Sequence, residues 1–165
     1  QSVKNRIARE PEVAECWKQI KETADKKLQN GGLNDVEYLS LTYLMTGEKK
    51  YSDRIKKILL DVIQAKTWGS AEMLARIPVW TADLGLSHKA HLSAIAYDAI
   101  YNDLSTSERK EIALGLKRLA LDPSLGDWLL EPTRIHALNS MGHNWWTSCV
   151  CMGGLYRKLR KRQDF

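Results

Sequence analysis

The chain has 165 residues, 44% of them hydrophobic and 27% charged, with a formal net charge of +5 at pH 7. These values predict one globular domain over residues 1–165 with a sizeable core, and no run approaches the roughly 18 apolar residues of a membrane span. Most of the excess charge lies in residues 156–165, where five Lys and Arg residues accompany one Asp. We interpret this basic tail as a solvated helix end or a disordered terminus. We expect no nucleic-acid partner, because no aromatic or Gly-rich recognition pattern accompanies the tail.

Helical periodicity accounts for most of the chain, whose apolar residues are dominated by Leu and Ala. Pro11 suits the first turn of a helix that Asn30-Gly31-Gly32 should stop. Asn34 can cap a second helix, which should end at Thr46-Gly47, and a third should begin near Tyr51. The short connection between the second and third helices predicts an antiparallel hairpin.

The same plan follows in the second half. Residues 67–86 have no clean period and several turn formers, so we expect a structured loop with one short helix around Ala71–Arg76. Ser87 should open another helix. Ser105 and Glu108 have the spacing of a capping box, which predicts the start of its hairpin partner.

Residues 122–140 contain Pro123, Gly126, Trp128 and Pro132, and we expect a second irregular stretch before a last helix that starts near Asn144. The chain therefore alternates helix pairs with Trp-bearing loops. This alternation predicts an all-α fold of stacked antiparallel hairpins whose loops gather at one end and carry function. Trp68, Trp80 and Trp128 are expected to anchor these loops, and Tyr97 and Tyr101 to lie in the core.

The segment Met141-Gly142-His143-Asn144-Trp145-Trp146 is the richest in chemistry. Successive helical side chains point about 100° apart, so Trp145 and Trp146 cannot both face one core. Beside them, His143 can transfer a proton and Asn144 can both donate and accept hydrogen bonds. A helix cap at His143-Asn144 is the plain alternative. If the segment is functional, we expect it to bind an oxygen-rich, partly apolar ligand such as a polysaccharide.

Three segments together resemble a known family. LTYLMTGEKKYSDRIKKIL resembles the hairpin of α/α-toroid polysaccharide lyases, in which one helix ends in Thr-Gly-acidic and the next starts with Tyr. AIAYDAIYNDLSTSERKEI is similar to the Tyr-Asp…Leu-Ser…Glu-Arg hairpin of the same proteins, and MGHNWW resembles their Asn-Trp-Trp segment. The resemblance covers roughly residues 35–157 and is greatest to the heparinase II/III-like group. It implies an incomplete (α/α)-toroid, the N-terminal portion of a longer lyase.

Such enzymes cleave uronic-acid polysaccharides by β-elimination. The resemblance implies that Asn144 contacts the substrate carboxylate, that His143 is a base or a second neutralising group, and that Trp145 or Trp146 stacks on a sugar. Trp80 and Arg76 complete the candidate substrate-binding set, with a loop anchor and a surface ion pair as their alternatives. No residue matches the proton-transferring Tyr. The family also implies a periplasmic or secreted location and an anionic polysaccharide as partner.

Two rival functions remain open. A glycoside hydrolase needs two carboxylic groups across a cleft, for which Asp83, Asp127 and Glu131 are available. A non-catalytic domain would bind glycans or proteins through the Trp-bearing loops. We expect no metal and no cofactor: Cys149-x-Cys151 lacks a second ligand pair, and no carboxylate pattern completes His88 and His91. The three cysteines are expected to be buried free thiols. The oligomeric state is not readable from the sequence.

Overall fold

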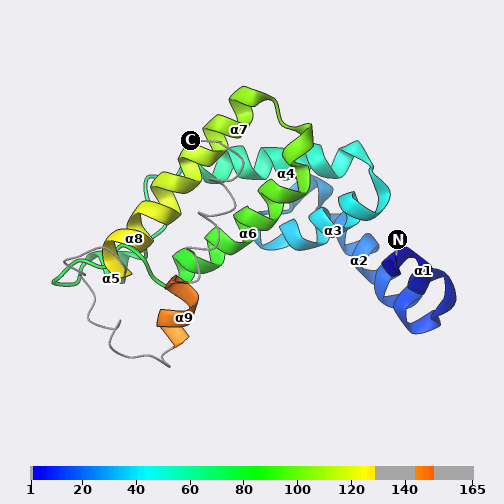
Figure 1. Cartoon of the computed structure of the whole chain (residues 1–165), viewed down its shortest axis with the longest axis horizontal. Coiled ribbons are helices and arrows are strands. Elements are labelled where there is room, and N and C mark those ends of the chain that lie inside the picture. The colour runs from blue at the N-terminus through cyan, green and yellow to red at the C-terminus, as the bar shows by residue number, and fades with distance from the viewer. Residues whose placement is uncertain (1, 129–143, 151–165) are drawn as a thin grey trace.

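The computed structural model describes residues 2–128 and 144–150, without the side chains of Trp146 and Val150. Every regular element within these ranges is a helix, which confirms the all-α class (Figure 1). The expected basic tail at 156–165 lies outside the described residues. No helix in the described part of the chain is long and apolar enough to cross a membrane.

The elements follow one another with short connections, except between α4 and α6 and before α9. In chain order they are α1 (Ser2–Arg9), α2 (Pro11–Asn30), η1 (Leu33–Asp35), α3 (Val36–Thr46), α4 (Lys49–Val62), α5 (Ala71–Leu74), α6 (Leu84–Ile100), η2 (Tyr101–Asp103), α7 (Thr106–Leu116), η3 (Lys117–Leu121), α8 (Asp122–Trp128) and α9 (Asn144–Val150).

Most of the predicted starts and stops are confirmed. Pro11 occupies the first turn of α2, and the Gly31 N–H bonds the Lys27 carbonyl at its end. Gly47 closes α3 in the left-handed conformation (φ 73°), which other residues adopt at a steric cost. The Ser105–Glu108 capping box opens α7 as expected.

One helix was not anticipated, and two predicted helix starts are wrong. The helix α1 was not anticipated; it contains no buried residue, so it shows no core-facing stripe. Asn34 lies within η1, and α3 starts after Asp35 without a side-chain cap. The helix α6 begins before Ser87, because the Asp83 carboxylate caps it by accepting from the Leu86 N–H at 2.7 Å.

The prediction of an irregular stretch from residue 122 is wrong for its first seven residues. The helix α7 continues through the π-helical segment η3 into α8, although Pro123 lies in its path. Proline lacks an N–H and its ring clashes with the carbonyl four residues earlier in an α-helix. The wider π turn just before Pro123 relieves this conflict, so the helix continues to Trp128.

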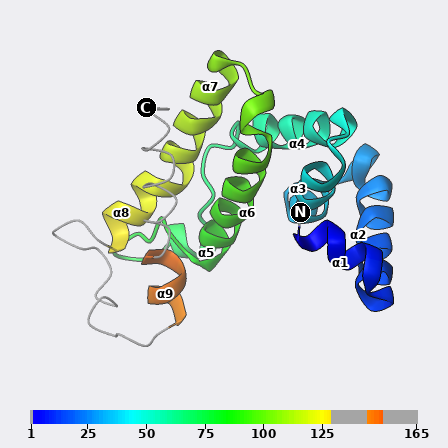
Figure 2. The same cartoon turned by 45° about the vertical axis from the view of Figure 1, so that its right-hand side comes forward.

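The helix α6 lies at the centre of the molecule, with α3 and α4 on one side and α7 on the other (Figures 1 and 2). The helices α3, α4, α6, α7 and η3 supply most of the buried core. Packing is close where α7 meets the end of α4: a Cβ on Gly115 would lie 2.6 Å from the Ile63 Cβ. The helix α1 and the start of α2 project at one end, while α5, α8 and α9 occupy the opposite end.

Residues of the two family-like hairpins bind the scaffold together. Asp103 after α6 forms an ion pair with Lys49 of α4 at 3.4 Å, so it joins both hairpins. Arg109 donates to the Tyr101 carbonyl at 3.0 Å and lies over its ring. These polar residues therefore have scaffold roles at the hairpin turns.

Asp25 links α2 to α4 through the Tyr51 hydroxyl, which donates to its carboxylate at 2.6 Å. This hydrogen bond, with the bonds from Lys21 and Lys50, lowers the pKa of Asp25 from 3.8 to about 2, despite an opposing effect of desolvation. A carboxyl whose pKa is lowered on folding stabilises the fold above its unfolded pKa. That contribution is lost as the pH falls from 3.8 towards about 2.

We predict that Asp25→Asn lowers the free energy of unfolding by about 1 kcal/mol at neutral pH, discounted because the Asp25 side chain is 38% exposed. The difference from wild type should shrink on acidification below pH 4, measured by urea unfolding at several pH values. Asp53→Asn is the control, since that carboxylate pairs only with exposed Lys49 in the described structure. A difference that does not change with pH would contradict this assignment.

Candidate functional site

The segment between α4 and α6 is irregular but firmly attached to the helices. The Trp68 indole N–H donates to the Val62 carbonyl at 3.3 Å, and Lys89 of α6 donates to the Trp68 carbonyl. Further along, the Ser70 N–H donates to the Asp83 carboxylate at 3.1 Å. Trp68 is buried, which agrees with its expected role as a loop anchor.

Asp127 at the end of α8 holds the last part of this segment. Its buried carboxylate accepts from the Thr81 N–H, from the Thr81 hydroxyl at 2.9 Å and from the Ala82 N–H at 2.8 Å. The indole of Trp128 donates to the Ala82 carbonyl at 3.1 Å. The backbone of Thr81 and Ala82 is thus held through both of its N–H groups and through the Ala82 carbonyl.

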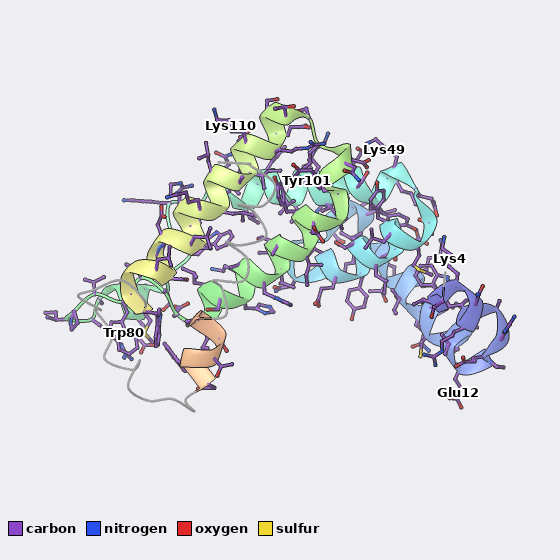
Figure 3. All side chains as sticks on the ribbon, in the orientation of Figure 1. Lys4, Glu12, Lys49, Trp80, Tyr101 and Lys110 are labelled. Atoms are coloured by element: carbon purple, nitrogen blue, oxygen red, sulfur yellow. The ribbon has the colours of Figure 1, made fainter. Side chains whose placement is uncertain are left out.

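Three indoles gather beside this attachment. The Trp80 ring meets the Trp128 ring edge-on at 6.5 Å between centroids, and the Trp145 ring at 5.7 Å. Trp128 is fully buried, whereas Trp80 and Trp145 are half-buried. Figure 3 shows Trp80 near the start of α9, at the end of the molecule opposite Lys4. We call Trp80, Trp128 and Trp145 the indole cluster.

Arg76 adds a cation to the indole cluster. Its guanidinium carbon lies 4.8 Å from the centroid of the Trp80 ring, within the range of a cation–π interaction. The same guanidinium forms an exposed ion pair with Glu72 at 3.1 Å. The loop tip beyond it exposes Ile77 almost completely. The cluster therefore combines apolar rings with a positive charge that solvent can reach.

Two contacts attach the helix α9 to the rest of the described structure. Trp145 packs against the hydrophobic core, and the Ser87 hydroxyl of α6 lies 3.3 Å from the buried Cys149 sulfur. Burial raises the pKa of the Cys149 thiol, so it stays protonated. The prediction of buried thiols is correct for Cys149 and wrong for Cys16, which is exposed, while Cys151 lies outside the described residues.

The structure brings together three of the residues predicted to bind substrate, Arg76, Trp80 and Trp145. Asn144 is exposed at the first position of α9, next to Trp145. His143 and the Trp146 side chain lie outside the described residues, so their roles stay predictions. Trp128 was expected as a loop anchor, with a sugar platform as the alternative. No sequence signal placed it against Trp80, because the helical path through Pro123 was not foreseen.

The acidic residues considered for a hydrolase have other partners. Burial alone would raise the pKa of Asp83, but the N–H groups of Leu86 and Ser70 outweigh it and lower that pKa. Asp83 is therefore held ionised and is a poor proton donor. The three hydrogen bonds accepted by Asp127 give it a structural role, and Glu131 lies outside the described residues.

His88 and His91 are both exposed on α6. Within residues 2–128 and 144–150, no three His, Cys, Asp or Glu side chains lie close enough together to hold a metal ion. A pair of histidines at this spacing could supply at most two ligands of the four that zinc usually takes.

No protein-family model, curated protein or solved structure matches this chain. The geometry described above therefore carries the functional argument, together with the resemblance noted in the sequence.

We predict that Asp127→Ala lowers the free energy of unfolding by about 3 kcal/mol, because it leaves the Thr81 and Ala82 N–H groups without their acceptor. Urea unfolding followed by circular dichroism measures the change. Asp122→Ala is the matched control, since its carboxylate binds Lys117 at the surface and should cost less than about 1 kcal/mol. Equal losses in the two variants would contradict the role given to Asp127.

Proposed function

We propose that this chain belongs to a polysaccharide lyase with an α/α-toroid scaffold, which binds a uronic-acid polymer and cleaves it by β-elimination. The observation that carries the proposal is the grouping of Arg76, Trp80 and Trp145 at the start of α9. Trp145 of this group belongs to the motif GHNWW. Asn144 of the same motif is exposed beside it, at the first position of α9.

The cluster suits an acidic sugar. Half-buried indoles offer apolar faces and edges for the C–H surface of a sugar ring. Trp128 packs against Trp80, and Trp80 packs against Trp145. Arg76 is exposed, so it can exchange its ion pair with Glu72 for the carboxylate of a uronate. A neutral sugar would stack on the indoles but would form no ion pair with Arg76.

The arrangement of the hairpins supports the toroid part of the proposal. The pairs α3–α4 and α6–α7 follow one another along the chain, and α6 packs against both α3 and α4. Asp103 connects the two pairs at their turns. A closed toroid is a ring of such hairpins, and these two would form adjacent parts of it.

The chemistry follows from the acidity of the carbon next to a uronate carboxylate, which is low while the carboxylate carries its full charge. In the proposed mechanism, Asn144 hydrogen-bonds the carboxylate and stabilises the enolate that forms. His143 removes the proton or assists in neutralising the carboxylate. The leaving oxygen requires a proton donor, a role that no residue has been assigned.

A non-catalytic glycan-binding domain is the second candidate. It is favoured by the positions of two tyrosines: Tyr97 is buried, and Tyr101 lies beyond the far end of α6 from Trp80 (Figure 3). The indole cluster would then bind an acidic glycan without cleaving it. The resemblance implies a periplasmic or secreted location for either protein.

We predict that Arg76→Gln weakens binding of an acidic oligosaccharide, such as an alginate or hyaluronan fragment, by about threefold to tenfold. Calorimetry or Trp fluorescence measures the affinity, and a carboxyl-reduced oligosaccharide should bind both proteins equally. Arg6→Gln is the matched control, since Arg6 forms a similar exposed ion pair with Glu10 on α1. Equal affinities of all three proteins would contradict the role of Arg76.

We predict that the full-length protein encoded with this chain releases unsaturated uronates, detected by their ultraviolet absorbance, and that His143→Ala and Asn144→Ala each greatly reduce that rate. Circular dichroism checks that both variants fold. Reducing ends without new absorbance would indicate a hydrolase, and binding without either product would indicate the non-catalytic domain. Retained activity in both variants would indicate that His143 and Asn144 only cap the helix.

A further inference from the structure

A second candidate site lies beside the attachment of the loop to α8. A pocket of about 350 Å³ opens between the segment after α4 and the junction of η3 with α8. Its lining residues are Lys66, Thr67, Thr81, Arg118, Leu119, Asp122 and Pro123. The indole cluster contributes none of these side chains, so this pocket is a separate feature.

The pocket has an excess of positive charge. Lys66 and Arg118 line it from two different segments, and within the described part of the chain neither forms an ion pair with a carboxylate. The one acidic lining residue, Asp122, is already neutralised, because Lys117 contacts both of its oxygens at 2.6 and 2.8 Å. Two basic residues thus line the pocket, and neither has a carboxylate partner among the described residues.

Arg118 is fixed in place rather than freely mobile. Its two terminal nitrogens donate to the carbonyls of Ile63, Ala65 and Lys66, where α4 ends. These neutral acceptors orient the guanidinium, and no described carboxylate forms an ion pair with it. Its Nε–H makes no hydrogen bond to any described residue. A preorganised cation loses little entropy when an anion binds, which favours recognition by the pocket.

A hydroxyl adds a neutral donor. The Thr67 oxygen accepts from the Gly69 N–H at 3.1 Å, so the Thr67 hydroxyl hydrogen is available to donate. The Thr81 hydroxyl, in contrast, donates to Asp127 and contributes only its oxygen. Lysine, arginine and a donating hydroxyl are groups that bind the oxygens of small anions.

We propose that this pocket binds an oxyanion, a carboxylate or sulfate group, through Lys66, Arg118 and Thr67. The anion is either free or carried by an acidic sugar. The inference does not depend on lyase activity, because it rests on the pocket, its two cations and its hydroxyl donor alone.

The test is an NMR titration of the folded chain with sodium sulfate at constant ionic strength, with chloride as the balancing anion. We expect a saturable shift of the Thr67 amide, weakened about threefold to fivefold by Lys66→Gln. Lys57→Gln is the matched control, because it removes the same charge from an exposed position of α4 outside the pocket. It should bind sulfate as wild type does.

Parallel titrations with galacturonate and with galactose distinguish the two sources of the anion. Saturation by galacturonate at lower concentration than sulfate supports a sugar carboxylate as ligand, and equal binding of the two supports a free anion. Galactose should cause no shift at Thr67. The proposal is overturned if shifts never saturate, or if Lys66→Gln binds both anions as tightly as Lys57→Gln. Neither result would affect binding of glycans at Trp80, which Arg76→Gln tests separately.

Discussion

The hydrogen bonds from residues 81 and 82 to the Asp127 carboxylate are the constraint on which the candidate sites depend. The segment from residue 63 to residue 83 contains only the single-turn helix α5, so it has little regular structure to fix its path. Asp127 and Trp128, on a helix more than forty positions later in the chain, fix that path through their hydrogen bonds to residues 81 and 82. A buried carboxylate is stable there because three donors satisfy one of its oxygens. The position of Trp80, and with it the position of Arg76, follows from this attachment.

The constraint in turn requires an unbroken helix from α7 to α8. If Pro123 ended the helix, Asp127 and Trp128 would lie on a loop and could not approach residues 81 and 82 with fixed geometry. The π-helical segment η3 allows the helix to pass Pro123 and also presents Arg118 to the end of α4. One local deviation from α-helical geometry therefore serves both the indole cluster and the cationic pocket. Such π-helical segments are frequent at functional sites.

The predictability of each element follows from how local its determinants are. The stops at Gly31 and Gly47 and the Ser105–Glu108 box were readable because each involves residues within one turn. The start of α6 was missed although its cap is equally local, because Ser87 was taken as the first residue while Asp83 caps the helix by accepting from the Leu86 N–H. The contact of Trp80 with Trp128 and Trp145 was unreadable, since it joins three segments through tertiary packing. Arg76 and Trp80 were predicted as ligands from residue type, and no pattern predicted their stacking on each other.

The polar residues of the hairpins that resemble a lyase lie away from the candidate site. Within the hairpin segments that resemble a lyase, Asp103, Ser105, Glu108 and Arg109 cap helices or join turns. Any protein built from such hairpins benefits from these residues, so they support the scaffold rather than the reaction. The chemistry of the proposed lyase depends instead on Arg76, Trp80 and the start of α9, which lie at the end of α6 opposite Asp103. Ligand binding at that end of the molecule therefore tests the function. An acidic sugar would contact both Arg76 and the indoles, and a neutral sugar the indoles alone.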